Sequence, residues 1–211
     1  MRKPSPLALA ASLLLVAAPI ARANFHFWDI QEIYSNADGS IQFIEFFTAS
    51  GGQEVLGTHT LASTGATTFT FPSNLPVGQA HPGGGTYPAS TAGQTFLVGT
   101  SNLGTLFGVT PDYIISANFL STGAGRLVNF SGGTDVVNLD NSGANSPLPT
   151  DGVRSLNGVT SNATATVSTL NAQATPTNFF GSTATIPEPT SVALIASGLL
   201  LGAARRRRAR A

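Results

Sequence analysis

The chain has 211 residues, of which only 9% are charged and 42% are apolar. This length holds one domain or at most two small ones, and so few charges disfavour long amphipathic helices with charged solvent faces. The chain contains no cysteine, which excludes disulfides, thiolate metal sites and a cysteine nucleophile.

Basic residues are concentrated towards the two ends of the chain, so the formal net charge of zero is misleading. Between Asn24 and Pro187 there are nine acidic residues but only two basic ones, Arg126 and Arg154, which gives this stretch a net charge of −7. An acidic stretch without a basic patch repels phosphate backbones. We therefore expect no nucleic-acid partner.

Residues 1–23 have the three parts of a secretory signal peptide. Met1-Arg2-Lys3 is a positively charged start, residues 7–16 are apolar, and Ala21 and Ala23 supply the small side chains that signal peptidase requires. We expect this segment to form a signal helix that is cleaved after Ala23. An uncleaved N-terminal anchor is the alternative, and the short apolar run disfavours it.

The stretch that follows is predicted to be rich in β-strands. Residues 27–34 and 41–48 are aromatic and β-branched runs around an Asp38-Gly39 turn, which predicts a hairpin whose second strand, apolar on both faces, lies inside a sheet. Further strands are predicted at 54–61, 67–71, 94–100, 113–116, 126–130, 134–139 and, at a sheet edge, 151–157. A Pro/Gly-rich loop is expected at 72–91, a helical turn at 103–109, and a hairpin joining 126–130 to 134–139.

About eight short strands with frequent turns predict an all-β domain, an immunoglobulin-like β-sandwich over residues 24–158. The Ser/Thr-rich residues 159–186 are expected to form a last strand or a stalk that lifts the domain off a membrane. The motifs IQEIY at 30–34, QFIEF at 42–46, FTFP at 69–72 and GQTFLV at 93–98 resemble the lamin-tail domain over Phe25–Asp140. That resemblance implies an immunoglobulin-like fold and no particular activity.

The acidic and histidine residues do not form a recognisable catalytic or metal-binding motif. His26, His59 and His81 lack metal-ligand spacing. Glu32 and Glu45 are expected to face each other across the first hairpin and to accept hydrogen bonds at a sheet edge, rather than to act as an acid–base pair. We therefore expect no enzymatic activity, no cofactor and no metal.

Calcium is the one metal that the sequence leaves open. Asp135, Asn138, Asp140 and Asn141 place four oxygen ligands in a short span, which is the chemistry that Ca²⁺ prefers. The spacing matches neither an EF-hand loop nor a calcium-binding repeat, so a solvated turn is the expected structure.

The last 25 residues have three parts in a fixed order. Pro187-Glu188-Pro189 comes first, and its prolines hold the backbone extended. Residues 190–204 are apolar and are expected to form a transmembrane helix, short enough to need help from flanking arginines. Arg205, Arg206, Arg207 and Arg208 follow as a stop-transfer cluster that stays on the cytoplasmic side.

This order of parts resembles the PEP-CTERM sorting signal over residues 187–211. The resemblance implies that the protein is an exported protein of a Gram-negative bacterium, that Pro187, Glu188 and Pro189 are recognised by the membrane enzyme exosortase, and that the protein is anchored in the inner membrane before processing. A simple membrane anchor, in which the prolines only end the domain, is the alternative.

Together these observations predict a non-catalytic, structural or adhesive protein of the cell surface or of the exopolysaccharide matrix of a biofilm. A polysaccharide-binding module is the second hypothesis, and it would use exposed aromatic residues such as Trp28, Tyr87 or Tyr113. A cryptic enzyme is the third hypothesis, and it would require convergent polar groups in a deep pocket.

Overall fold

Two β-sheets and a short helix are present in the computed structural model, which describes residues 25–121, 126–139, 148–157, 165–166 and 170–185. The elements are β1 (Asp29–Ser35), β2 (Gln42–Thr48), β3 (Thr60–Ser63), β4 (Phe69–Thr70), β5 (Gln94–Thr100), α2 (Ser101–Phe107), β6 (Tyr113–Ile115), β7 (Leu127–Phe130), β8 (Asp135–Asn138), β9 (Arg154–Asn157), β10 (Ala165–Thr166) and β11 (Leu170–Gln173). The all-β prediction is confirmed.

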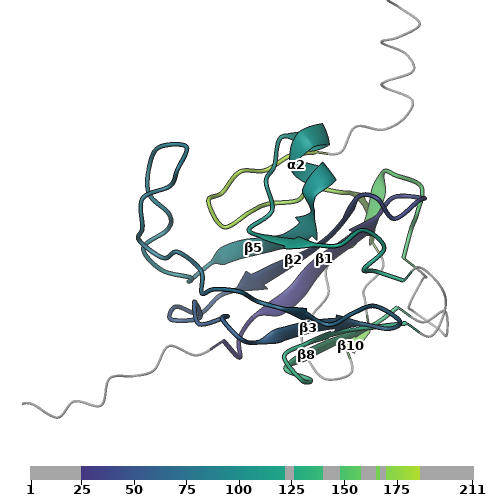
Figure 1. Cartoon of the computed structure of the whole chain (residues 1–211), viewed down its shortest axis with the longest axis horizontal. Helices are drawn as coiled ribbons and strands as arrows, with labels where there is room; N and C mark the ends of the chain where they lie inside the picture. Colours follow the sequence, from purple (N-terminus) through teal and green to yellow (C-terminus); the bar gives the residue numbers. More distant parts are fainter. Residues whose placement is uncertain (1–24, 122–125, 140–147, 158–164, 167–169, 186–211) are drawn as a thin grey trace, which may run out of the picture.

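The strands form one sheet in the order β11-β9-β1-β2-β5-β6 and a second in the order β10-β8-β7-β3-β4. Neighbouring strands are antiparallel except for the β5–β6 and β10–β8 pairs. The predicted β1–β2 and β7–β8 hairpins are both present, and β2 lies inside its sheet between β1 and β5, as its two apolar faces indicate. Figure 1 shows the two sheets as two layers.

Aromatic rings from both sheets fill the space between the layers. Phe46 stacks on Phe96 with a centroid distance of 4.5 Å, and Phe130 of the second sheet lies 5.0 Å from Phe46. These three side chains are fully buried. Because each large ring removes 150–250 Å² of surface from water, this cluster supplies much of the hydrophobic stabilisation of a chain without disulfides.

Two of the three aromatic residues that the polysaccharide-binding hypothesis requires to be exposed are buried, which weakens that hypothesis. Trp28 is fully buried beside Phe96, and its indole N–H donates to the backbone carbonyl of Gln53 at 2.7 Å. Tyr113 is also buried, and its hydroxyl donates to the carbonyl of Ser73. In both cases a loop carbonyl satisfies the polar end of the ring, so the whole side chain enters the core.

Two strand assignments also differ from the sequence prediction. The strand expected at 54–61 begins only at Thr60, because a turn with Thr58 at a φ of 74° interrupts the chain, and the amide of His59 bonds the carbonyl of Leu56. The strand β9, expected at an edge, lies inside the first sheet between β1 and β11. Its partner β11 falls in the polar stretch 159–186, whose sequence has no strong strand pattern.

Strands that follow residue 158 add to both sheets, as β10 and β11. Of the two alternatives for the stretch 159–186, a last strand is therefore what the described residues show. After β11 the chain continues as a segment, residues 174–185, that we call the strap. The strap runs over the first sheet beside α2, on the face turned away from the second sheet (Figure 1).

The strap and α2 cover a second apolar cluster on this outer face. Tyr34, Phe43 and Leu97 of the sheet are buried there against Leu103 of α2 and Ala174 of the strap. Both faces of the first sheet are thus buried, which explains why β2 and β5 are apolar at successive positions rather than alternately.

The close packing of α2 on β5 predicts a large cost for a small substitution at Gly99. A Cβ added there would lie 3.2 Å from Cδ2 of Leu103 in α2, 3.1 Å from Cγ of Pro111 and 3.2 Å from the backbone carbonyl oxygen of Gln42. We expect Gly99→Ala to lower the free energy of unfolding by about 1–3 kcal/mol. Gly104→Ala in α2 is the matched control, because its Cβ meets only ordinary contacts at 3.5 Å or more, and it should leave stability equal or slightly higher. Equal denaturant midpoints for the two variants would contradict this packing.

Candidate functional site

Three acidic side chains, two of them buried and the third half-buried, hold the strap against the first sheet. Glu32 of β1, Glu45 of β2 and Asp112, just before β6, form what we call the carboxylate row. Glu32 accepts from the backbone N–H of Thr175 at 3.0 Å, Glu45 from that of Thr177 at 2.6 Å, and Asp112 from that of Phe179 at 2.8 Å. Three alternate amides of the strap therefore donate to three successive carboxylates.

The strand register explains this spacing. Glu32 pairs directly with Glu45 across β1 and β2, and Glu45 pairs with Leu97 across β2 and β5. Asp112 lies beside Leu97, since its Oδ2 also accepts the Leu97 N–H at 2.8 Å. In an extended chain, successive amides point to opposite sides, so residues 175, 177 and 179 present their N–H groups to the same side. Pro176, which has no N–H to satisfy, lies between the first two.

The predicted pairing of Glu32 with Glu45 is confirmed, and so is their role as acceptors for backbone and hydroxyl donors, since the Thr175 hydroxyl also donates to Glu32. The expected location at a sheet edge is wrong. Both glutamates lie on interior strands and are almost completely buried, with exposed fractions of 1% and 6%.

Burial raises the pKa of every carboxyl group in the row. Desolvation, and secondly the charge of Glu32, raise the pKa of Glu45 to about 8. Desolvation also raises the pKa of Glu32, against opposing hydrogen bonds, and raises the pKa of Asp112 to about 6. Neither arginine of the acidic stretch contributes to these shifts. At neutral pH the Glu32–Glu45 pair therefore retains a proton, because two buried like charges disfavour each other.

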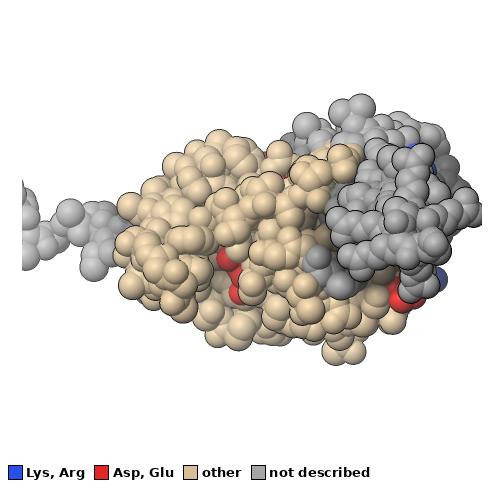
Figure 2. Space-filling view, turned by 90° about the horizontal axis from the view of Figure 1, so that it is seen from above, with Lys and Arg blue, Asp and Glu red and all other residues tan. Residues whose placement is uncertain are grey.

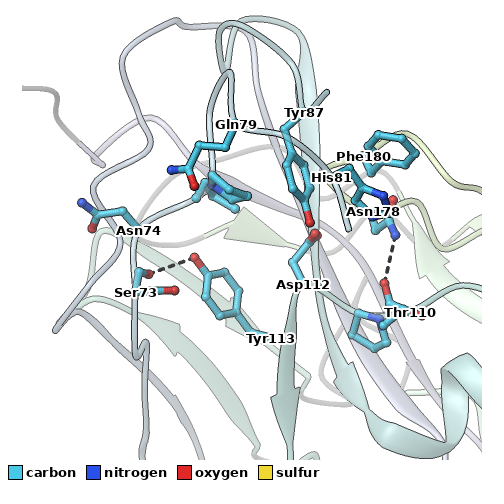
Figure 3. Close-up of a pocket in the computed structure, with 13 residues that line it drawn as sticks. Ser73, Asn74, Gln79, His81, Tyr87, Thr110, Asp112, Tyr113, Asn178 and Phe180 are labelled. Atoms are coloured by element: carbon cyan, nitrogen blue, oxygen red, sulfur yellow. Dashed lines mark hydrogen bonds between the residues drawn. The ribbon is translucent and has the colours of Figure 1, made fainter. Parts of the chain in front are cut away.

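A pocket of about 480 Å³ adjoins the end of the row at Asp112. It lies between the 72–91 loop, the residues before and within β6, and the strap, which contributes Asn178 and Phe180 (Figure 3). Tyr87 stands over it with its hydroxyl directed toward Asp112, and Gln79 extends across the loop side. On the strap side, the Asn178 side-chain amide donates to the carbonyl of Thr110 at 2.9 Å, which fixes the strap to the pocket wall.

The other residues singled out in the sequence are scattered. His26 and His59 both contact the ring of Phe25, and His81 stacks on Phe180 near the pocket. Asp135 is buried and accepts the Ile30 N–H at 2.7 Å, whereas Asp140 and Asn141 lie outside the described residues. Within the described ranges, no three His, Asp or Glu side chains gather in a way that could hold a metal ion.

The predicted signal peptide, including Ala21 and Ala23, and the predicted sorting segment from Pro187 to Arg208 also lie outside the described residues. Among the residues that are described, no helix has the length and apolar character needed to cross a membrane. The described part of the face seen in Figure 2 carries few charged atoms, in keeping with the burial of Glu32 and Glu45.

Comparison with known families identifies the segment that follows the strap. Residues 185–208 match the family model of the PEP-CTERM protein-sorting motif. The chain carries a PEP-CTERM sorting motif. This motif implies processing by exosortase, with export, membrane association of the C-terminal segment during processing, and subsequent release to the cell surface. The matched residues include Pro187-Glu188-Pro189 and Arg205–Arg208.

No curated protein and no solved structure matches the chain. The match to the PEP-CTERM motif covers residues 185–208 and assigns no family to the rest of the chain. The immunoglobulin-like and lamin-tail-like character of Phe25–Asp140 stays a prediction.

Sequence reasoning found two of the three acids in the row and missed the third. Asp112 follows Pro111 in a short irregular segment, where an acid is usually solvated, and nothing in the sequence indicates that the strap covers it. The donors were missed as well, because the strap is a Thr/Pro/Asn-rich stretch with no hydrophobic period.

The carboxylate row predicts that stability falls as the pH rises. An unfolded glutamate ionises near its usual pKa of 4.5, whereas Glu45 in the folded chain ionises at about 8. Between these values the folded state binds more protons than the unfolded state, so the stabilisation present below pH 4.5 is lost progressively up to about pH 8. We expect the melting temperature of the full chain in detergent to fall by up to about 10 °C between pH 5 and pH 9.

Glu45→Gln should remove most of this fall, because the amide oxygen still accepts the Thr177 N–H but cannot ionise. Glu54→Gln is the matched control, since Glu54 lies outside the row and is only half-buried, and it should keep the wild-type profile. If the melting temperature of Glu45→Gln falls with pH as steeply as that of the wild type, the raised pKa of Glu45 is not the cause of the fall.

Proposed function

We propose that the chain is a non-catalytic exported protein whose β-domain is displayed at the cell surface or in the extracellular matrix of a Gram-negative bacterium, with a structural or adhesive role. The PEP-CTERM motif is the observation that carries this proposal. The acidic, lysine-free composition of the domain supports it, because such a surface suits display outside the cell better than binding to nucleic acid or to an anionic membrane surface.

The arrangement in the membrane follows from the two ends of the sequence. In this proposal residues 1–23 direct export and are removed after Ala23. Residues 190–204 then span the inner membrane, with Arg205–Arg208 on the cytoplasmic side and Pro187, Glu188 and Pro189 outside as the exosortase recognition motif. The partners in this stage are the membrane and exosortase.

The strap sets the distance between the folded domain and this motif. Ala184 is held by a backbone bond from its N–H to the carbonyl of Pro176, and Pro187 follows only three residues later. Three extended residues span at most about 11 Å. The motif is therefore presented directly beside the folded domain, without a long stalk, and exosortase would act close to the domain surface.

The buried acids favour a non-catalytic role for the domain. Each carboxylate of the row is used to hold backbone amides of the strap or of the sheet, so these groups are occupied by structural bonds. The second candidate function is polysaccharide binding, and the pocket beneath Tyr87 favours it. The burial of Trp28 removes it from that role, whereas Tyr113 lines the same pocket although it is largely buried.

Processing in the native host tests the proposal. We expect mass spectrometry of the wild-type protein from the cell-surface fraction to find Asn24 as the first residue and to find no peptides from the arginine cluster. Glu188→Ala should leave the protein in the inner-membrane fraction with its tail intact. Glu54→Ala, a substitution of the same type inside the domain, should be processed normally. Full-length wild-type protein that begins at Met1 and is soluble in the cytosol would overturn the proposal.

A further inference from the structure

We propose that the pocket between the 72–91 loop, β6 and the strap binds a neutral sugar unit. This inference rests on the proposed display of the domain outside the cell and assigns a site to its second candidate function. The volume of about 480 Å³ lies within the range of about 300–1,000 Å³ that is usual for small-molecule sites.

Aromatic rings form one wall of the pocket. His81 stacks on Phe180 with a centroid distance of 3.8 Å, and Tyr87 meets both rings edge-on, at 5.0 Å and 5.7 Å. These contacts hold Tyr87 in a fixed position beside the cavity (Figure 3). Aromatic faces carry negative charge density, and the C–H groups on one face of a sugar ring are weakly positive, so the two surfaces attract each other.

Hydrogen-bonding groups stand opposite and beneath this wall. The side-chain amide of Gln79 makes no hydrogen bond to another described residue. Its two N–H donors and its carbonyl acceptor are therefore available to a ligand. Asp112 uses its Oδ2 for the amides of Leu97 and Phe179, which leaves further lone pairs on the carboxylate. His81 accepts the Gly83 N–H at Nδ1, so its Nε2 is the ring donor. Each hydroxyl group of a sugar both donates and accepts a hydrogen bond, so a site that offers donors and acceptors side by side suits neighbouring hydroxyl groups.

Charge selects against an anionic ligand. No lysine or arginine lines the pocket, while Asp112 lies at its base. The stretch from Asn24 to Pro187 also carries a net charge of −7, which raises the cost of bringing a carboxylate or sulfate to the surface. A neutral, hydroxyl-rich ligand satisfies the polar groups without this penalty.

The strap completes the site. Asn178 and Phe180 belong to the pocket wall, and the carboxylate of Asp112 both lines the pocket and holds the Phe179 amide of the strap. A docked strap is therefore required for the pocket to exist in this shape. Sugar binding and strap docking should stabilise each other, since a ligand that binds only the docked form favours that form.

Titration of the full chain in detergent micelles by amide chemical shifts tests the proposal. The neutral probes are maltotriose, cellotriose and tri-N-acetylchitotriose, and trigalacturonate is the anionic probe. We expect at least one neutral probe to shift the amides around Gln79, Tyr87 and Phe180 with a Kd on the order of 1 mM, and trigalacturonate to bind at least about tenfold more weakly. Tyr87→Ala should weaken binding about tenfold, and Gln79→Ala several-fold.

Phe27→Ala is the matched control for the aromatic substitution, because Phe27 is 58% exposed and does not line the pocket. It should bind as the wild type does. Unchanged strap amide shifts in Gln79→Ala confirm that the exposed substitution leaves the fold intact. The proposal is overturned if no neutral probe shifts the pocket amides at about 50 mM, or if Tyr87→Ala and Gln79→Ala both bind as tightly as the wild type. Processing in the host is measured separately, so a failure of the sugar site does not affect the sorting result.

Discussion

The described structure depends on three carboxylates, two buried and one half-buried, that accept hydrogen bonds from three alternate backbone amides of one segment. Glu32, Glu45 and Asp112 supply the acceptors that a partner strand would otherwise offer on the sheet-facing side of the strap. Elsewhere the strap pairs with itself, at the antiparallel bridge between Thr177 and Thr183. Buried carboxyl groups without a cationic partner are costly, and here the strap amides offset part of that cost. Proton uptake by the Glu32–Glu45 pair reduces the remainder.

This arrangement links the fold to both functional features of the chain. The strap closes the apolar cluster over β2 and β5, forms one wall of the pocket at Asp112, and leads within three residues of Ala184 to the start of the PEP-CTERM motif. Undocking of the strap would therefore expose the apolar cluster and remove one wall of the pocket at the same time. The strap, which immediately precedes the sorting segment in the sequence, is thus held to the domain by backbone hydrogen bonds.

The sequence predicts the features that have strong local patterns. Both hairpins, the interior position of β2 and the cross-strand pairing of Glu32 with Glu45 follow from alternation, turn residues and strand length. Features that depend on distant parts of the chain were missed. The carbonyl of Gln53 that buries Trp28 lies in a loop, and the strap that covers Asp112 is a polar stretch whose binding depends on backbone amides, which leave no trace in side-chain composition.

Hydrogen exchange at the strap amides tests the central claim most directly. The account predicts that the amides of Thr175, Thr177 and Phe179 in the full chain are protected as strongly as those of β2. It also predicts that Glu45→Ala lowers protection along the whole strap while leaving β7 and β8 unchanged. Free exchange of these three amides in the wild type, with the rest of the first sheet protected, would contradict a strap held by carboxylates.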